Sequence, residues 1–325
     1  MKNCRIICAH KYIPERKIDN DEMSRMVDTS DEWIVSRTGI KERHISTGEN
    51  TSYMAGEVLK GLIEKSGISP LDIDLLIVAT ISPDYLTPST ACLVQHIAGA
   101  KNAFAFDVNA ACSGFVYALS TAEKFISSGK YKTAAVIGAD ILSKMIDFTD
   151  RSTCVLFGDG AGGVLLQACE ENHYLSEDMN SCGDKAMALY GGHMPVDTVF
   201  SKEQPNMGKY IKMNGREIFD FTLTEVPESI KRALSKAGLD LEDIDYIVPH
   251  QANARIVNYM AKKLSIDVSR FFINIDQYGN TTAASIPIAL SDMLEEGKIE
   301  IGSGKKLALV GFGGGLTWGT VIIKI

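Results

Sequence analysis

The pattern of hydrophobic and polar positions repeats along this chain. Residues 59–80 read LKGLIEKSGISPLDIDLLIVAT, and residues 230–250 read IKRALSKAGLDLEDIDYIVPH. In both segments, apolar residues at helical spacing are followed by a glycine, a short acidic link and an apolar run of strand length. Gly67 matches Gly238 in this register. The pattern therefore predicts, in each copy, a helix that ends at the glycine and a buried strand after the link.

The parallel between the two copies continues beyond these segments. We expect apolar strands at residues 104–108 and 271–275, each ending in a tight turn that leads to Cys112 in the first copy and to Asn280 in the second. Further matched pairs are predicted helices at 113–128 and 281–296, strands at 134–137 and 307–310, and strands at 162–166 and 319–323. Apolar strands that alternate with helices are typical of a mainly parallel sheet covered on both faces. The chain is thus predicted to be an α/β protein made of two duplicated halves.

The duplication divides the chain into three regions. We assign residues 1–170 to an N-terminal half, residues 216–325 to a C-terminal half, and residues 171–215 to a connecting excursion that matches neither copy. The excursion is rich in Gly, Asp, Asn and Met. Two interpretations stay open: the segment lines a pocket or links the halves, or it is a plain surface insertion.

Composition narrows the classes of function. The net charge of −8 argues against a broad nucleic-acid surface. Seven cysteines at irregular spacing, without a C-x-x-C pair, argue against a disulfide framework and a structural metal site. The first residues carry charges and lack the apolar core of a signal peptide, and no run approaches the length of a membrane span. We therefore expect a cytoplasmic protein that acts without nucleic acid, membrane or metal.

Polar residues follow three of the predicted strands. Cys112, His250 and Asn280 each come just after a strand end, where ligands of such sheets bind. The small residues around Cys112 permit a sharp turn into a helix, whose N-terminus favours a thiolate and lowers the thiol pKa. His250 and Asn280 supply two donors for a developing negative oxygen. Each of the three residues, taken singly, also has a purely structural interpretation: a buried cysteine, a structural histidine and a helix cap.

A glycine run, residues 311–315 (GFGGG), follows the predicted strand at 307–310. Such a run lets backbone N–H groups approach a ligand closely, and Gly314 is a candidate donor for an oxyanion. It is not a phosphate-binding P-loop, because no G-K-[ST] follows. A glycine-rich bend without a ligand is the alternative interpretation.

An ordered set of motifs runs through the whole chain. They are TSDEWIV at 29–35, RTGI at 37–40, ERHI at 42–45, the turn around Cys112, DR at 150–151, FGDGAG at 157–162, PHQAN at 249–253, GNTTAAS at 279–285 and FGGG at 312–315. With these motifs the sequence closely resembles the β-ketoacyl-acyl-carrier-protein synthase III family. These are the initiating condensing enzymes of type II fatty-acid synthesis, and they belong to the thiolase superfamily. The resemblance implies two thiolase-like halves in an αβαβα arrangement around one crevice.

The resemblance also implies a reaction and the residues that perform it. Cys112 would accept the acyl group of an acyl-CoA primer, with acetyl-CoA as the expected primer. His250 and Asn280 would bind the thioester carbonyl of malonyl-acyl carrier protein, and Cys112 and Gly314 would form the oxyanion hole. The products would be 3-oxoacyl-acyl carrier protein, coenzyme A and CO₂. Coenzyme A enters as a substrate thioester and no cofactor is implied. A homodimer is implied, and we place its interface at residues 104–108.

The family's binding positions map onto further residues of this chain. The implied coenzyme A contacts are Thr29, Trp33, Arg37, Arg151, Gly215, Phe219, Ala252 and Asn253, with the adenine between Trp33 and Arg151. The implied acyl-carrier-protein contacts are Gln251, Ala252, Asn253, Ala254, Arg255, Lys262 and Lys263. The implied acyl pocket comprises Thr87, Leu142, Phe157 and Leu189. Two departures, Arg216 where the family has Asn and Asp220 where it has Lys, predict altered coenzyme A contacts and docking that is weaker or differently oriented.

Other assignments compete with this one. A Cys-His-Asn set also occurs in papain-like proteases, but this chain lacks their local signature. A secondary-metabolite condensing enzyme of the same fold, of the polyketide or quinolone type, shares related residues. A catalytically silent thiolase-fold partner subunit would usually have lost one of the three, and none is lost here.

Overall fold

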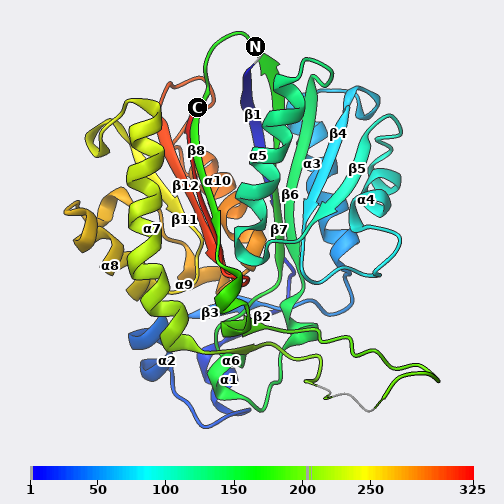
Figure 1. Cartoon of the computed structure of the whole chain (residues 1–325), viewed down its shortest axis with the longest axis vertical. Helices are drawn as coiled ribbons and strands as arrows, with labels where there is room; N and C mark the ends of the chain where they lie inside the picture. Colours follow the sequence, from blue (N-terminus) through cyan, green and yellow to red (C-terminus); the bar gives the residue numbers. More distant parts are fainter. Residues whose placement is uncertain (1–2, 203–204, 206) are drawn as a thin grey trace.

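The computed structural model describes residues 3–202, 205 and 207–325. Two sheets stand side by side with helices between them and on both outer faces, which gives the predicted order helix, sheet, helix, sheet, helix (Figure 1). The α/β thiolase-like architecture is confirmed. The prediction of mainly parallel sheets is wrong, because antiparallel strands complete both of them.

The first sheet has five strands in the order β1-β7-β6-β4-β5. They are β1 (Asn3–Tyr12), β4 (Leu75–Ala79), β5 (Phe104–Val108), β6 (Thr133–Asp140) and β7 (Gly160–Cys169). β4 pairs in parallel with β5 and β6, whereas β7 pairs antiparallel with β6 and β1. Every residue of β4 and β6 is buried, which explains why their sequences are continuous apolar runs. Helices α3 (Thr51–Ser66) and α4 (Thr90–Ala98) cover the outer face.

The second sheet has four strands in the order β11-β12-β13-β8. They are β8 (Tyr174–Ser181), β11 (Tyr246–Pro249), β12 (Lys306–Gly313) and β13 (Thr317–Lys324), and only β11 and β12 are parallel. Helices α7 (Gly215–Ala237) and α8 (Ala254–Leu264) cover its outer face. β8 falls within the region assigned to a connecting excursion, so that boundary is wrong: the second half begins at about residue 174. β8 pairs antiparallel at the edge of the second sheet as β1 does at the edge of the first, but the repeat found in the sequence did not include these two strands.

Two helices form the layer between the sheets. These are α5 (Gly114–Ser127) and α10 (Ser285–Glu295), and one apolar core joins them to both sheets. The backbone just before α10 approaches the first sheet closely: a Cβ at Gly138 would lie 2.2 Å from the carbonyl oxygen of Ala283. Because no side chain fits there, this glycine lets the two halves come into direct contact at that point.

The two halves carry matching strained turns. The 3₁₀ turns η2 (Ala111–Ser113) and η7 (Thr282–Ala284) lead into α5 and α10, and their first residues have φ of 47° and 49°. Residues in this left-handed region are uncommon outside glycine and mark a conformation imposed by the surroundings. The alignment of the two halves that pairs Gly67 with Gly238 also pairs Cys112 with Ala283 and Asn109 with Asn280. Cys112 and Asn280 are therefore not equivalent positions.

The strand predicted at residues 271–275 does not form. Phe271 makes one isolated bridge to Ile247, and the short helix α9 (Ile275–Tyr278) begins where the strand was expected to end. The apolar pattern there reflects burial of the segment, not pairing.

Short elements complete the structure. They are β2 (Lys17–Asp19), β3 (Glu42–His44), β9 (Leu189–Tyr190), β10 (Lys212–Met213), α1 (Asn20–Ser24), α2 (Asp31–Thr38), α6 (Arg151–Cys154), η1 (Pro70–Asp72), η3 (Leu142–Met145), η4 (Gly183–Ala188), η5 (Leu241–Asp243) and η6 (Val268–Arg270). Among the helices of the described residues, none has the length and apolar character needed to cross a membrane.

Candidate active site

Cys112 lies in the turn between β5 and α5, in contact with the glycine run at the end of β12. A Cβ at Gly313 would lie 2.7 Å from the Cβ and 3.1 Å from the Sγ of Cys112, so the strand reaches the thiol only because it has no side chain there. The backbone N–H groups of Cys112 and Gly314 lie near the thiol and lower its pKa. Two backbone donors therefore stand beside the sulfur, where the oxyanion of an acyl group attached to that sulfur would form.

The thiol does not have the lowered pKa that the helix N-terminus predicts. Burial, together with the nearby carboxyl of Asp140, raises the pKa of Cys112 to about 12, and the two backbone N–H groups offset only part of this increase. The prediction of a thiolate in the resting protein is thus wrong. A charged sulfur is disfavoured in this dry site, since desolvation outweighs the helix terminus.

His250 follows β11 and is only 1% exposed. Its Nδ1 lies 2.8 Å from the Oγ of Ser285, and its ring meets Phe312 edge to face, with centroids 5.2 Å apart. Burial lowers the pKa of His250 to about 3, so the imidazole is neutral at physiological pH. Because Ser285 engages Nδ1, the nitrogen left for a ligand in the cavity is Nε2.

Asn280 is held by the turn that follows it. Its Oδ1 accepts a hydrogen bond of 2.9 Å from the backbone N–H of Thr282, and its own backbone bridges Phe157. With the oxygen occupied, the side-chain NH₂ is the end free to donate into the cavity. The hydroxyl of Thr282 in turn donates to Asp140, a buried carboxyl at the end of β6 whose pKa burial raises.

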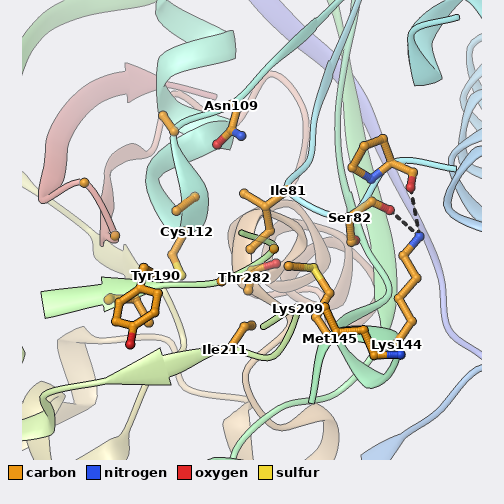
Figure 2. Close-up of a pocket in the computed structure, with 18 of the residues that line it drawn as sticks. Ile81, Ser82, Asn109, Cys112, Lys144, Met145, Tyr190, Lys209, Ile211 and Thr282 are labelled. Carbon is orange, nitrogen blue, oxygen red and sulfur yellow. Dashed lines mark hydrogen bonds between the residues drawn. The ribbon is translucent and has the colours of Figure 1, made fainter. Parts of the chain in front are cut away.

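Two cavities meet at Cys112. The smaller, of about 150 Å³, is lined by Cys112, His250 and Asn280 together with residues of α7 and β12. The larger, of about 680 Å³, also borders Cys112, and Figure 2 shows Ile81, Met145 and Ile211 around it. The three side chains that the sequence singled out thus share one cavity, and the nucleophile also borders a second.

The chain resembles known proteins over its whole length. The descriptions "3-Oxoacyl-[acyl-carrier-protein (ACP)] synthase III" and "3-Oxoacyl-[acyl-carrier-protein (ACP)] synthase III C terminal" match residues 106–183 and 234–325. The beta-ketoacyl-[acyl-carrier-protein] synthase III of Clostridium acetobutylicum is 50% identical over 324 residues, which are 100% of this chain and 99% of that protein. The enzyme of that name from Streptococcus pneumoniae is 50% identical, over 98% of this chain and 97% of its own length. The chain belongs to the 3-oxoacyl-[acyl-carrier-protein] synthase III family.

Solved structures agree with this membership. The 3-oxoacyl-[acyl-carrier-protein] synthase III of Aquifex aeolicus superimposes with a TM-score of 0.92 at 44% identity, covering 100% of both chains. The priming β-ketosynthase of the R1128 polyketide pathway superimposes equally well, with a TM-score of 0.92, at 29% identity over 100% of this chain and 96% of that one. As a member of the synthase III family, the chain is a condensing enzyme of the acyltransferase class.

The positions that the family resemblance gave to coenzyme A fall into two groups. Gly215, Phe219, Ala252 and Asn253 line the smaller cavity. Trp33 lies beyond it, with the guanidinium groups of Arg37 and Arg151 each 4.9 Å from its ring centroid. A base between Trp33 and Arg151 needs two van der Waals layers, about 7 Å, so Arg151 must move for an adenine to enter. Thr29 is half-buried, and its Oγ1 has no hydrogen-bond partner within the described residues.

The positions given to acyl carrier protein lie on and before α8. Arg255, Lys262 and Lys263 are exposed on this helix, while Ala252, Asn253 and Ala254 are half-buried at its start. Gln251 is 2% exposed and donates to the backbone oxygens of Pro249 and Phe272, so it holds the loop after β11 and does not face a partner. That part of the predicted contact set is wrong, because the amide is needed inside. Arg216 pairs weakly with Asp220 on the exposed face of α7, at 4.0 Å.

Two of the four residues predicted for the acyl pocket border the cavities described above. Phe157 and Leu189 line both cavities. Leu142 is fully buried in a neighbouring apolar cluster, and Thr87 is exposed; neither lines a cavity here. Sequence reasoning missed Asp140, Thr282 and Ser285. The signal for them was present, since Asp140 ends a strand and the other two lie in the GNTTAAS motif.

Possible metal ligands do not cluster near the site. Within the described residues, no group of at least three His, Cys, Asp and Glu side chains is arranged to hold a metal ion. The side chains and backbone groups around Cys112 are the groups available here for acyl transfer and condensation.

Proposed function

We propose that this chain catalyses the decarboxylative condensation of an acyl-CoA primer with malonyl-acyl carrier protein, which initiates fatty-acid synthesis. The observation that carries the proposal is the position of Cys112. It lies between a cavity that holds His250 and Asn280 and a second, larger cavity. A nucleophile at such a junction can hold an acyl group on one side while a second thioester binds on the other.

The first half-reaction is acyl transfer. Sγ of Cys112 attacks the thioester carbon of the acyl-CoA, and the backbone N–H groups of Cys112 and Gly314 stabilise the tetrahedral oxyanion. Coenzyme A leaves with the proton that the thiol loses. Because burial raises the thiol pKa, this proton is given up during the attack and not beforehand.

The second half-reaction is condensation. His250 and the NH₂ of Asn280 donate to the carbonyl oxygen of the malonyl thioester and stabilise the enolate formed when CO₂ leaves. The enolate carbon then attacks the acyl carbon on Cys112, and collapse of the adduct releases the 3-oxoacyl product and the Cys112 sulfur, which takes up a proton from water to restore the thiol. A neutral histidine suits this role, since it donates without transferring its proton.

The primer is the open part of the proposal. Acetyl-CoA is the primer that the family resemblance implies, yet the second cavity, about 680 Å³ and lined by Ile81, Met145, Phe157, Leu189 and Ile211, has room for a longer or branched chain. Similarity to a priming ketosynthase of a polyketide pathway supports a second candidate, priming of secondary metabolism with an unusual acyl-CoA. The acyl-CoA that acylates Cys112 fastest distinguishes the two.

The partners form part of the same proposal. Exposed Arg255, Lys262 and Lys263 give an acidic carrier protein a local basic surface on a chain of net charge −8. Strand β5 is a sheet edge that exposes Phe104, beside Phe106 and Phe125, which suits a homodimer interface. Cysteines that are all free suit a reducing compartment, the cytoplasm.

Intact mass spectrometry tests the proposal directly. Wild-type protein and Cys112→Ser are mixed with acetyl-CoA, then with longer and branched acyl-CoAs, and finally with malonyl-acyl carrier protein. One acyl group on wild type only, followed by its transfer to the carrier protein with loss of CO₂, is the expected result. Light scattering at micromolar concentration checks the dimer. Absence of an adduct with every acyl-CoA would leave a catalytically silent partner subunit as the better assignment.

A further inference from the structure

The hydroxyl of Ser285 lies between two atoms of the active-site turn. Its Oγ is 2.8 Å from Nδ1 of His250 and 2.9 Å from the backbone oxygen of Thr282. Ser285 is 2% exposed, so bulk water does not compete for these contacts. A hydroxyl has one proton to donate. The direction of that proton decides which nitrogen of His250 carries the ring hydrogen.

The backbone oxygen of Thr282 and Nδ1 of His250 differ in whether another group already donates a hydrogen bond to them. The backbone oxygen of Thr282 already accepts a hydrogen bond from the backbone N–H of Ser285. The ring of His250 also lies near this Thr282 oxygen, but a carbonyl oxygen cannot donate, so the hydroxyl of Ser285 is the donor that the described residues offer to Nδ1. A neutral imidazole carries one N–H, so Nε2 donates toward the cavity only when Nδ1 is an acceptor.

Asn280 shows the same arrangement. The backbone N–H of Thr282 occupies Oδ1 of Asn280 and leaves its NH₂ for the cavity. If Ser285 donates to His250, residues of one turn hold the acceptor atoms of both side chains. Both donors then face the same carbonyl oxygen.

We propose that Ser285 is a positioning residue that donates its hydroxyl proton to Nδ1 of His250 and thereby keeps the proton on Nε2, toward the cavity. This inference rests on the proposed function, because the donor is needed for the malonyl enolate. The opposite tautomer points a lone pair at that oxygen and repels it. Acyl transfer to Cys112 uses backbone donors instead, so the two half-reactions depend on Ser285 to different extents.

Kinetics on Ser285→Ala tests the role in the reaction. Condensation is expected to fall about 100-fold, the effect of losing one oxyanion donor, with acylation of Cys112 changed by less than about threefold. Ser285→Thr, which keeps a hydroxyl, is expected to recover most of the condensation rate. The matched control is Ser291→Ala, a buried serine on the same helix whose hydroxyl contacts Glu295 instead. Equal loss of both half-reactions in Ser285→Ala, or none in either, would overturn the proposal.

The tautomer itself is measured by ¹⁵N NMR on histidine-labelled resting protein, with His250→Asn identifying the resonances. Wild type and Ser291→Ala are expected to show the Nε2–H tautomer, and Ser285→Ala a shift toward Nδ1–H. An Nδ1–H tautomer in wild type contradicts the inference. This readout needs no substrate, so it stands even if wild type fails to condense malonyl-acyl carrier protein, a result that would reject the proposed function instead.

Discussion

The hydroxyl of Thr282 donates a hydrogen bond to the buried carboxyl of Asp140, and this contact ties the two halves of the fold together beside the nucleophile. Asp140 ends β6 of the first half, while Thr282 begins the strained turn of the second half at φ 49°. The same threonine fixes Asn280 through its N–H and contacts Ser285 through its carbonyl oxygen. One residue therefore connects the positions of Asn280, His250 and the Cys112 turn.

Thr282→Val removes this hydroxyl while keeping the shape of the side chain. Asp140 is then left with one buried oxygen lacking its partner, so we expect a loss of about 1–3 kcal/mol in the free energy of unfolding. Condensation is expected to slow as well, because the turn loses its anchor to the first half. Urea unfolding and the condensation assay measure both effects. Thr282→Ser keeps the hydroxyl and serves as control; equal losses in the two variants would show that the methyl group matters and the hydrogen bond does not.

His250 is expected to make stability depend on pH. Its pKa is about 3 in the folded protein, below its ordinary value of 6.5, so the unfolded chain binds the extra proton between these values. The contribution of His250 to the free energy of unfolding is fully present above pH 6.5. It decreases by about 1.4 kcal/mol per pH unit as the pH falls toward 3. Denaturant unfolding of wild type and His250→Asn at pH 4.5 and 6.5 isolates this contribution. A wild type that loses no more stability than the variant would refute it.

The raised pKa of Cys112 predicts slow alkylation. Iodoacetamide reacts with the thiolate, and burial keeps that form scarce at pH 7, so the rate should keep rising with pH beyond pH 9. The measurement is the rate at which iodoacetamide adducts form, followed by intact mass spectrometry at several pH values. Cys112→Ala gives the background from other cysteines, including exposed Cys92. A rate that levels off below pH 8 would mean that the helix N-terminus prevails over burial.

Gly313→Ala is expected to displace the nucleophile. The added Cβ would lie 2.7 Å from the Cβ of Cys112, a distance that requires the strand or the turn to move. We expect a loss of about 1–3 kcal/mol in stability and at least tenfold slower acylation of Cys112. Gly183→Ala, where nothing lies within 4 Å of the new Cβ, should change stability by less than about 0.5 kcal/mol. Normal acylation in Gly313→Ala would show that the turn adapts.

Reversing the charge of Arg255 tests the docking surface. Arg255→Glu should raise the apparent KM for malonyl-acyl carrier protein severalfold, less so at high salt, and leave the KM for acyl-CoA unchanged. Lys101→Glu makes the same charge change on an exposed residue of the first half and should have no effect. An unchanged KM for the carrier protein in Arg255→Glu would place docking elsewhere.

Much of the fold was determined locally by the sequence. The helices that end at Gly67 and Gly238 do so because glycine adopts the left-handed cap there, at φ 68° and 66°. The strands after them are buried on both faces and read as apolar runs, so their existence follows from hydrophobic pattern alone. The repeated order of these elements predicted two α/β halves. Cys112, His250 and Asn280 followed from the same pattern, since each comes after a strand end or its equivalent.

Tertiary structure decided what depends on neighbours distant in sequence. The antiparallel edge strand β8 is mostly polar (YLSEDMNS), whereas the segment at residues 271–275 is mostly apolar, and only their neighbours determine that the first pairs as a strand and the second does not. The thiol pKa of Cys112 was predicted with the wrong sign, because the helix terminus is visible in sequence whereas the desolvation by surrounding side chains is not. For the same reason, Asp140, Thr282 and Ser285 emerged as supports of the site only when the two halves came together.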